Sequence, residues 1–468
     1  MIVMKFGGTS TQDAAAITNV VNIVKSRLSK GPMVVVSAIA QATNILESAG
    51  KLASESQSDA ALSALQQLSD RHLGIINNLI DDRQRRDALK NIIEISFNEL
   101  RELVKGVSIL RELTPRTLDS FYCYGELLSS RIVAAALQEA NVDSRWIDTK
   151  DFMITDENFT RAMPMIEYVE DRLKAIVKPL FEKNIVPVTQ GFIGITTTGR
   201  RTTMGRESSD YSASVVGCAL NADDIQIWTD VDGVLTADPT VVPEPKKIKL
   251  LSFEEAFDLS YFGAKVLHPN TMLPAIEKNI PIHIYNSRRP TLSGTLVTKQ
   301  TDAKTAIPKS VAYKRNVLIL NIVPKKRYGQ YIFWEHVNNV LTKHDVASHM
   351  TATSEYNYSV VLDATYNIPA IVHDLNTIGK VSVIEGKGIV CLVGSNLRQS
   401  PGLLDKIFHS ITDVGIAMVT FGPSKSNISF IVDDNDVLDV VRKIHNNFFS
   451  AVKDDEVFEI LGHHQTPT

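Results

Sequence analysis

A lysine and two glycines close the first apolar run of the chain, in the segment K-F-G-G-T-S at residues 5–10. Glycines lack side chains, so their N–H groups can approach an anion closely, and the helix start that follows adds N–H groups without partners. Lysine supplies a point charge for phosphate oxygens. A Gly-Gly turn alone also marks many ordinary strand–helix junctions, but a lysine in an apolar strand needs an anionic partner. We therefore predict a phosphate-binding turn, and the absence of G-x-x-x-x-G-K-[ST] excludes a Walker-type loop.

A second polar loop, at residues 202–213, leads into another helical pattern and contains Arg206, Ser209 and Asp210. An aspartate in the first turn of a helix is favoured by the helix dipole, so Asp210 can be simply structural. The functional interpretation is that Asp210 orients lysines around a phosphoryl group, while Arg206 pairs with a substrate carboxylate.

Polar residues also follow the apolar run that ends at Trp228. In open α/β sheets ligands bind beyond the carboxyl ends of strands, which is where Thr229 and Asp230 are expected. An Asx-type turn at Asp232-Gly233 is the structural alternative, and both interpretations can hold together.

Further along the chain, the segment F-G-A-K-V-L-H-P contributes a second lysine, Lys265. Taken alone, Lys265 would more often be a surface residue. Phosphoryl transfer needs several cations around the transferring group, however, so a second lysine is expected in such a site.

Hydroxyl and carboxylate side chains that suit a small amino acid occur in two more places. Ser37 and Thr43 follow the second apolar run, and Glu126 lies in a helical segment, G-E-L-L-S-S. Together they could bind an ammonium and a carboxylate, although Glu126 by itself reads as an ordinary exposed helix residue.

The first 290 residues alternate short apolar runs with helical patterns, which predicts a mostly parallel sheet covered on both faces. The predicted strands are residues 2–6, 33–36, 185–188, 225–228 and 281–284. Residues 55–108 carry no strand pattern and are expected to form a helical insertion. Residues 291–312 are rich in polar residues, as in a linker.

The remainder of the chain contains an internal repeat, in which residues 354–363 match residues 424–433. Each copy has the order strand, helix, strand, strand, helix, which is typical of ferredoxin-like units. We expect two such modules, at 313–385 and 386–468, with a C-terminal strand available to complete the first. Repeated small units of this kind are typical of regulatory or pairing modules. Simple duplication for stability is the structural alternative, and it is the less favoured one because no catalytic constellation lies there.

Bulk composition is ordinary: 468 residues, 44% hydrophobic and 22% charged, with a net charge of -4. This balance gives no bulk attraction to nucleic acid or to anionic membranes. No apolar run approaches the roughly 20 residues that span a bilayer. Three widely separated cysteines favour reduced thiols over a disulfide framework or a zinc site. A cytoplasmic protein is the expectation.

Taken in order, these segments resemble the aspartate kinases of the amino-acid kinase superfamily over nearly the whole chain. The ordered set is K-F-G-G-T-S, V-S-A-x-x-x-x-T-N, E-L-T-P before G-E-x-L-S-S, T-x-G-R-x-x-S-D-Y-S-A, W-T-D-V-x-G-V and F-G-A-K-V-L-H-P. The resemblance implies a three-layer αβα kinase domain followed by two ACT modules, and at least a homodimer formed through them. It also implies ATP with Mg²⁺ and the conversion of L-aspartate to 4-phospho-L-aspartate, the first step of lysine, threonine and methionine biosynthesis.

The resemblance also implies roles for individual residues. Lys5, Asp210 and Lys265 would be catalytic. The ATP-binding residues would be Lys5, Gly7, Gly8, Thr9, Ser10, Thr229, Asp230, Leu235 and Lys265. Aspartate would be bound by Ser37, Thr43, Glu126, Arg206 and Ser209, and no protein residue is assigned to the metal. The regulatory half looks most like the lysine-inhibited branch, and its effector residues would be Arg327, Gly329, His349, Thr353, Ser354 and Glu355.

Some positions depart from the family pattern. Glu207-Ser208 replaces a usual glycine pair, and Leu127 and Thr240 stand where arginines are usual. His349 stands where an aspartate is expected to meet the amino group of the effector. Two alternatives therefore stay open: a pseudo-kinase that only senses amino acids, and a sister kinase acting on another small acid.

Overall fold

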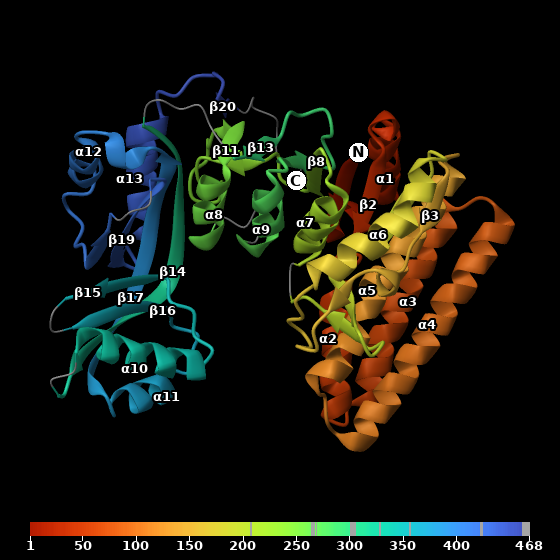
Figure 1. The fold of residues 1–468 in the computed structure, drawn as a ribbon, viewed down its shortest axis with the longest axis horizontal. Helices are drawn as coiled ribbons and strands as arrows, with labels where there is room; N and C mark the ends of the chain where they lie inside the picture. The colour runs from red at the N-terminus through yellow and green to blue at the C-terminus, as the bar shows by residue number, and fades with distance from the viewer. Residues whose placement is uncertain are drawn as a thin grey trace. The chain divides into compact units, whose positions relative to one another are not determined.

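The computed structural model describes residues 1–205, 208–263, 267, 269–299, 306–326, 329–354, 357–421 and 425–460. The chain divides into two compact units (Figure 1). The first unit contains residues 1–234, 249–253 and 266–300, and the second contains 235–248, 254–265 and 301–468. Among the described helices, none is both long enough and apolar enough to cross a membrane.

An eight-stranded sheet forms the centre of the first unit, in the order β11-β13-β12-β8-β1-β2-β5-β3. Its strands pair in parallel except for the antiparallel pair of β12 and β13. β1, β2 and β5 are buried along their whole length, as expected for parallel strands covered on both faces. The strands are β1 (Ile2–Phe6), β2 (Pro32–Val36), β3 (Ser144–Trp146), β5 (Val186–Gln190), β8 (Asp224–Thr229), β11 (Leu250–Ser252), β12 (Ile282–Asn286) and β13 (Thr295–Thr298).

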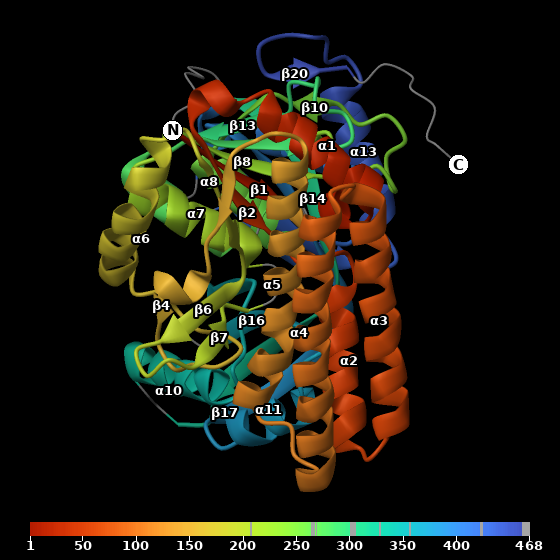
Figure 2. The same cartoon turned by 90° about the vertical axis from the view of Figure 1, so that its right-hand side faces the viewer.

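Helices cover both faces of this sheet, so the predicted three-layer arrangement is confirmed (Figures 1 and 2). α1 and α5 pack on one face and α6, α7 and α9 on the other. α3 and α4, which form the predicted helical insertion, run beside α5 together with α2. One continuous apolar core joins the sheet to α1–α5. The helices are α1 (Ala14–Lys25), α2 (Ala42–Ser54), α3 (Ser58–Leu79), α4 (Arg83–Leu110), α5 (Pro115–Glu139), α6 (Ile166–Phe181), α7 (Ser209–Leu220) and α9 (Pro269–Lys278).

Local sequence explains where the main helices of the site begin. Asp13 caps α1 by accepting the N–H of Ala16, and Thr114 caps α5 by accepting that of Thr117. Pro115 occupies the first position of α5, where no N–H is needed. A small three-stranded sheet of β4 (Ile154–Thr155), β6 (Ile193–Thr196) and β7 (Arg201–Thr203) completes the unit.

The second unit is built on a six-stranded antiparallel sheet in the order β15-β16-β14-β17-β19-β18. The order strand, helix, strand, strand, helix occurs twice, as the internal repeat predicts. Two long strands at the centre serve both copies. The elements are β14 (Ile307–Pro324), α10 (Gln330–Lys343), β15 (Met350–Thr353), β16 (Tyr358–Asp363), α11 (Ile368–Leu375), β17 (Gly379–Ser395), α12 (Leu403–His409), β18 (Met418–Thr420), β19 (Asn427–Asp433) and α13 (Val437–Phe449).

The compact units do not follow the boundaries expected from the sequence. Residues 235–248 and 254–265, placed in the catalytic domain by sequence, group with the C-terminal part of the chain. The reason lies largely in α8 (Phe253–Tyr261): its Glu255 forms a buried ion pair with Lys309 at 2.7 Å, and its Asp258 accepts the hydroxyl of Ser426 at 2.5 Å. Both partners belong to the ferredoxin-like modules.

Two short strands, β13 and β20, also differ from the predictions made from the sequence. β13 falls inside the segment expected to be a linker. The C-terminal strand β20 (Phe458–Glu459) pairs with β10 (Lys247–Ile248), in the sheet that also contains β9 (Val234–Leu235), and not with the first module. Lys247 is fully buried there and is neutralised by Glu459 at 2.8 Å, which explains the pairing.

Candidate active site

The glycine turn follows β1 directly and is fixed to the neighbouring strand β8. The N–H of Gly7 donates to Trp228 O at 3.1 Å, and residues 8–11 form one 3-10 turn. The Ser10 hydroxyl donates to Ser287 Oγ at 2.8 Å and is buried. Ser10 was predicted among the phosphate ligands, but its hydroxyl faces inward and anchors the turn. The N–H groups of Gly8 and Thr9 have no hydrogen-bond acceptor among the described residues.

Lys5 and Asp210 form an ion pair beside this turn, with 2.5 Å between Nζ and Oδ1. Lys5 is only 8% exposed, and a buried ammonium is tolerated because a carboxylate neutralises it. Lys5 belongs to β1, and Asp210 lies in the first turn of α7, which packs against β1. A side chain at Gly7 would begin 3.6 Å from the Lys5 ammonium, so this glycine leaves space around the charge.

A pocket of about 350 Å³ lies next to the glycine turn, within the first unit. Five of the residues predicted from the sequence line it: Gly8, Ser37, Thr43, Glu126 and Ser209. The remaining lining residues are Ala38, Ile39, Ala40, Gln41, Asn44 and Phe192. Residues from five separate parts of the chain therefore converge on one cavity.

Glu126 contributes a carboxyl group to this pocket, and the pKa of that group is strongly raised. Desolvation raises the pKa of its carboxyl to about 8, and a hydrogen bond from the backbone of Ala38 and the charge of Lys5 only partly oppose this. Its Oε2 is buried and has no hydrogen-bond partner among the residues that the structure describes. A side chain at Gly125 would meet the Ala38 side chain at 2.8 Å, so this glycine lets α5 approach the loop. A buried carboxylate with a free oxygen suits a cationic group of a ligand.

Two further residues are held in the pocket wall by backbone contacts. Ser37 donates its N–H to Phe6 O at 3.0 Å and accepts the Ser129 hydroxyl through its carbonyl at 2.7 Å. Ser209 packs against Gly191, where a side chain would come within 2.7 Å of the Ser209 Cβ. Gly191 is thus needed for the position of Ser209.

Thr229 and Asp230 lie at the carboxyl end of β8, beside β1, as the sequence indicated. The Thr229 hydroxyl donates to Asp230 Oδ1 at 3.2 Å, and Asp230 is exposed. Asp232 accepts a hydrogen bond from Asn286 at 2.6 Å and is ion-paired with Arg289, so neighbouring side chains engage its carboxylate. Leu235, the remaining nucleotide residue expected, lies in the second compact unit.

Several predicted residues fall outside the part of the chain that the structure describes. These are Arg206, Lys265, Arg327 and Glu355, and the departure Glu207. Gly263, two residues before Lys265, has φ +112° and lies so close to Tyr313 O that a side chain would meet it at 2.4 Å. Gly263 therefore lies directly against β14.

Three other positions that depart from the family pattern are Leu127, Thr240 and Ser208, and all three lie within the described residues. Leu127 packs at the edge of an apolar cluster formed by Tyr122, Cys123 and Phe192 with Ile193. Thr240 is exposed and donates to Asp238 through its N–H and its hydroxyl at 2.8 and 2.6 Å. Ser208 is buried, and its hydroxyl has no partner among the described residues.

The predicted effector residues are spread over the first ferredoxin-like module. Gly329 precedes α10, and Thr353 ends β15, where it is exposed. The Ser354 hydroxyl donates to Asn357 at 2.7 Å. His349 Nε2 lies 3.0 Å from Asp363 Oδ2, and burial lowers the pKa of this histidine, helped by the charge of Lys314. The imidazole is therefore engaged within the module.

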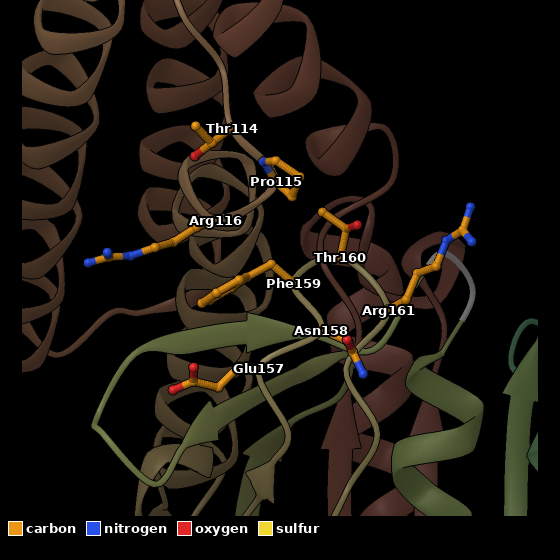
Figure 3. Close-up of a pocket in the computed structure, with 8 residues that line it drawn as sticks. All are labelled: Thr114, Pro115, Arg116, Glu157, Asn158, Phe159, Thr160 and Arg161. Atoms are coloured by element: carbon orange, nitrogen blue, oxygen red, sulfur yellow. The ribbon is translucent and has the colours of Figure 1, made fainter.

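A wider pocket of about 830 Å³ lies at the start of α5 (Figure 3). It is lined by residues 114–116 and 157–161, of which Thr114 and Pro115 belong to the motif E-L-T-P, and Arg116 and Arg161 point away from each other. Near it, the fully buried Asp119 accepts hydrogen bonds from Thr160 N at 2.9 Å and from Thr203 N and Oγ1 at 3.0 and 2.6 Å. Burial raises the pKa of Asp119, which these bonds oppose.

Sequence reasoning also missed Arg71, on α3. Its Nη1 donates to Ala40 O at 2.6 Å and its Nη2 to Gln12 O at 2.8 Å. A lone arginine within a helical insertion carries no sequence signal for such a role, because both acceptors are backbone carbonyls.

The fold and this site define a class of small-molecule kinase. The model of the "Amino acid kinase family" matches residues 1–286, and an "ACT domain" model matches residues 390–448. Aspartokinase 1, chloroplastic, of Arabidopsis thaliana is 35% identical over 96% of this chain and 80% of its own length. The lysine-sensitive aspartokinase 3 of Escherichia coli is 31% identical over 96% of this chain and 99% of its own length.

Solved structures agree with these matches. E. coli aspartokinase III in complex with aspartate and ADP (R-state) matches with a TM-score of 0.86 and 31% identity, over 96% of this chain and 100% of that one. Its complex with lysine and aspartate (T-state) matches with a TM-score of 0.78. The chain belongs to the amino acid kinase family and, within it, to the aspartokinases. The family expected from the ordered motifs is thus confirmed.

Proposed function

We propose that this chain transfers the γ-phosphoryl group of ATP to the β-carboxylate of L-aspartate, giving ADP and 4-phospho-L-aspartate. The observation that carries the proposal is the 350 Å³ pocket, in which the glycine turn meets Ser37, Thr43, Glu126 and Ser209. A phosphate-binding turn beside a pocket with a buried carboxylate suits a nucleotide and an amino acid together. The E. coli relative solved with aspartate and ADP supports the same pair of ligands.

The chemistry requires little from the protein beyond placement and charge. An oxygen of the ionised aspartate β-carboxylate attacks the γ-phosphorus, and the bond from that phosphorus to the β,γ-bridging oxygen breaks, leaving ADP. No general base is needed, because the attacking carboxylate is already deprotonated at neutral pH. Lys5, kept charged and oriented by Asp210, would stabilise the equatorial oxygens of the transferring group.

The substrate would be held at both of its ends. In this proposal Glu126 accepts the ammonium group, and the hydroxyls of Ser37, Thr43 and Ser209 donate to carboxylate oxygens. Arg206 and Lys265 would add charge to the aspartate and to the phosphates, respectively. Gly7, Gly8 and Thr9 would approach the phosphates, and Thr229, Asp230 and Leu235 would lie by the nucleotide. These assignments come from the pocket described above and from the motifs.

Magnesium would accompany the nucleotide. Among the described residues no group of three or more His, Cys, Asp or Glu side chains could hold a metal ion. Mg²⁺ commonly keeps water and binds through substrate phosphates with one or two carboxylates. The nearby carboxylate of Asp210 is engaged with Lys5, so we propose that phosphate oxygens and water supply most of the ligands.

Acyl-phosphate formation, trapped with hydroxylamine, tests the function directly. We expect hydroxamate with ATP and L-aspartate, and none with L-glutamate or N-acetyl-L-glutamate. Product with another acid alone would indicate a sister kinase. Absence of any turnover, together with calorimetric binding of an amino acid, would indicate a protein that only senses. Lys5→Ala should abolish the signal, which assigns it to this site.

We also propose that the ferredoxin-like modules bind an amino-acid effector and join chains into at least a dimer. Lysine is the first candidate, supported by the E. coli relative solved with lysine. The bond of His349 to Asp363 argues against tight binding, because it leaves less negative charge for an ammonium group. Titrating lysine, threonine and methionine into the turnover assay decides the effector, and no inhibition by millimolar lysine would reject lysine. Light scattering gives the assembly size.

A further inference from the structure

The helical insertion reaches the candidate active site through one side chain. Arg71 extends from α3, and its two terminal nitrogens donate to two backbone carbonyls, Ala40 O at 2.6 Å and Gln12 O at 2.8 Å. A planar guanidinium presents its donors in a fixed fork, so the two acceptors are held at a defined separation. A lysine at this position would offer a single ammonium in place of that fork.

The two acceptors belong to the two loops that form the site. Gln12 directly follows the glycine turn, whose Gly8 lines the pocket, and Ala40 lies in the loop that carries Ser37 and Thr43. The same Ala40 donates its N–H to Gly8 O at 3.1 Å. Both backbone groups of Ala40 are therefore occupied, one by the glycine turn and one by Arg71.

The loop around Ala40 has an irregular backbone that gains from such an outside partner. The next residue, Gln41, has φ +68°, which is a left-handed conformation that costs a residue with a side chain some free energy. A side chain at Gly8 would meet Ala38 O at 3.0 Å, so the two loops are in close contact here. Any widening of their separation would enlarge the pocket beside the turn.

The charge of Arg71 is accommodated locally. It helps to lower the pKa of Asp13, the carboxylate that caps α1, although the hydrogen bond from Ala16 is the larger cause. His72, the next residue, is fully buried, and desolvation lowers its pKa to about 4, so His72 adds no positive charge beside Arg71 at neutral pH. The guanidinium therefore joins α3 to the two loops through its hydrogen bonds to Ala40 O and Gln12 O.

We propose that Arg71 is a positioning residue that sets the distance between the phosphate-binding turn and the loop that binds the phosphoryl acceptor. The inference rests on the proposed function, because it assigns those tasks to the two loops. In-line transfer needs the reacting atoms about 3–3.5 Å apart, and a displacement of about 1 Å can cost about 10²-fold in rate. ATP and aspartate would each still contact the loop that binds it, so the KM values should change less than kcat.

The test compares three variants of the full chain: Arg71→Met, Arg71→Lys and Arg86→Met. Arg86 is the matched control, because it also lies half-buried in the insertion and donates to a carbonyl, Ile80 O at 3.2 Å, away from both loops. We expect Arg71→Met to lower kcat about 10²-fold with much smaller changes in KM for ATP and aspartate. Arg71→Lys should recover part of the loss, guanidinium ion should partly rescue Arg71→Met, and Arg86→Met should behave as the unchanged protein.

Amide hydrogen exchange of peptides covering residues 7–13 and 37–44 gives a readout that does not need turnover. Arg71→Met should raise exchange in both peptides, and Arg86→Met in neither. Unchanged exchange in both peptides, or an unchanged kcat, overturns the proposal. So does a loss of activity that only matches the unfolded fraction. If the unaltered protein forms no acyl phosphate, the proposed function fails, while the exchange result still decides whether Arg71 joins the loops.

Discussion

The Lys5 ammonium lies 2.5 Å from the Asp210 carboxylate, although the two residues are separated by more than two hundred positions in the sequence. Lys5 comes from the central strand β1 and Asp210 from the first turn of α7. The pair keeps a charged lysine in a nearly buried position, next to a turn whose glycines leave space for an anion. A stored positive charge that needs no reorganisation suits phosphoryl transfer.

Removing either member of this pair should lower turnover strongly. We expect Lys5→Met and Asp210→Asn each to reduce kcat by about 10²–10³-fold, because each removes or misplaces charge at the transferring group. The double variant should be little worse than Lys5→Met, since groups that act as a unit are not additive. Lys174→Met is the control: it breaks an ion pair with Glu170 on the surface of α6 and should leave kcat unchanged. Additive losses would contradict a joint role.

Glu126 should make aspartate binding depend on pH. Its pKa of about 8 means that the carboxyl is largely protonated at neutral pH before substrate binds, and only the ionised form attracts an ammonium group. We therefore expect kcat/KM for aspartate to rise with pH toward about 8. Glu126→Gln should lower it and flatten this rise. A profile of Glu126→Gln that keeps the same rise would assign the titration to another group.

The same group should affect stability in the opposite direction. Because the folded-state pKa is raised from 4.5 to about 8, the folded chain binds more protons than the unfolded chain between these values. The contribution of Glu126 to the free energy of unfolding should therefore fall as pH rises from 4.5 to 8. Thermal unfolding at pH 5 and pH 8 measures this. The difference between the two pH values should be smaller in Glu126→Gln.

Gly191 should be required for the aspartate pocket. A methyl group there would come within 2.7 Å of the Ser209 Cβ and 2.9 Å of its Cα, so Gly191→Ala must displace the start of α7. We expect a raised KM for aspartate. Gly74→Ala is the matched control, because nothing lies within 4 Å of its added methyl group in the middle of α3. That variant should keep full activity and gain up to about 1 kcal/mol of stability.

Lys309 should matter for stability rather than for chemistry. It is 1% exposed and pairs at 2.7 Å with Glu255, which also accepts from Ser395. Lys309→Met leaves the Glu255 carboxylate buried without this cation and should destabilise the second unit by about 3–5 kcal/mol, seen as a lowered calorimetric transition. The double variant with Glu255→Met should recover part of the loss. Lys443→Met, which breaks exposed pairs with Asp413 and Asp439, should have little effect.

Much of the site could be read from residue types in order. Strands that are apolar throughout, such as residues 33–36, have one plausible environment, the centre of a parallel sheet. A lysine at the end of such a strand needs an anion, and Asp210 provides it. The internal repeat likewise predicted two strand-helix-strand-strand-helix modules, because local periodicity and turn residues are sufficient to set element order.

Other features depended on contacts between distant segments. The hydroxyl of Ser10 belongs by sequence to a phosphate-binding turn, yet it bonds Ser287, which follows β12, two strands away from β1 in the sheet. Arg71 donates to backbone carbonyls, which every residue carries, so no pattern of residue types reveals its partners. The pairing of β20 with β10 involves two residues from each strand, which is too short to produce a periodicity.

The sequence alone therefore determined the family, the parallel sheet, the repeat and five of the eleven residues that line the pocket, since these follow from local patterns and from conspicuous residue types. The tertiary structure decided which of them share a cavity, that burial raises the pKa of Glu126, and that residues 254–265 belong with the ferredoxin-like modules. The physical reason is that desolvation, close approach at glycine and hydrogen bonds to backbone carbonyls depend on distances between segments far apart in the chain.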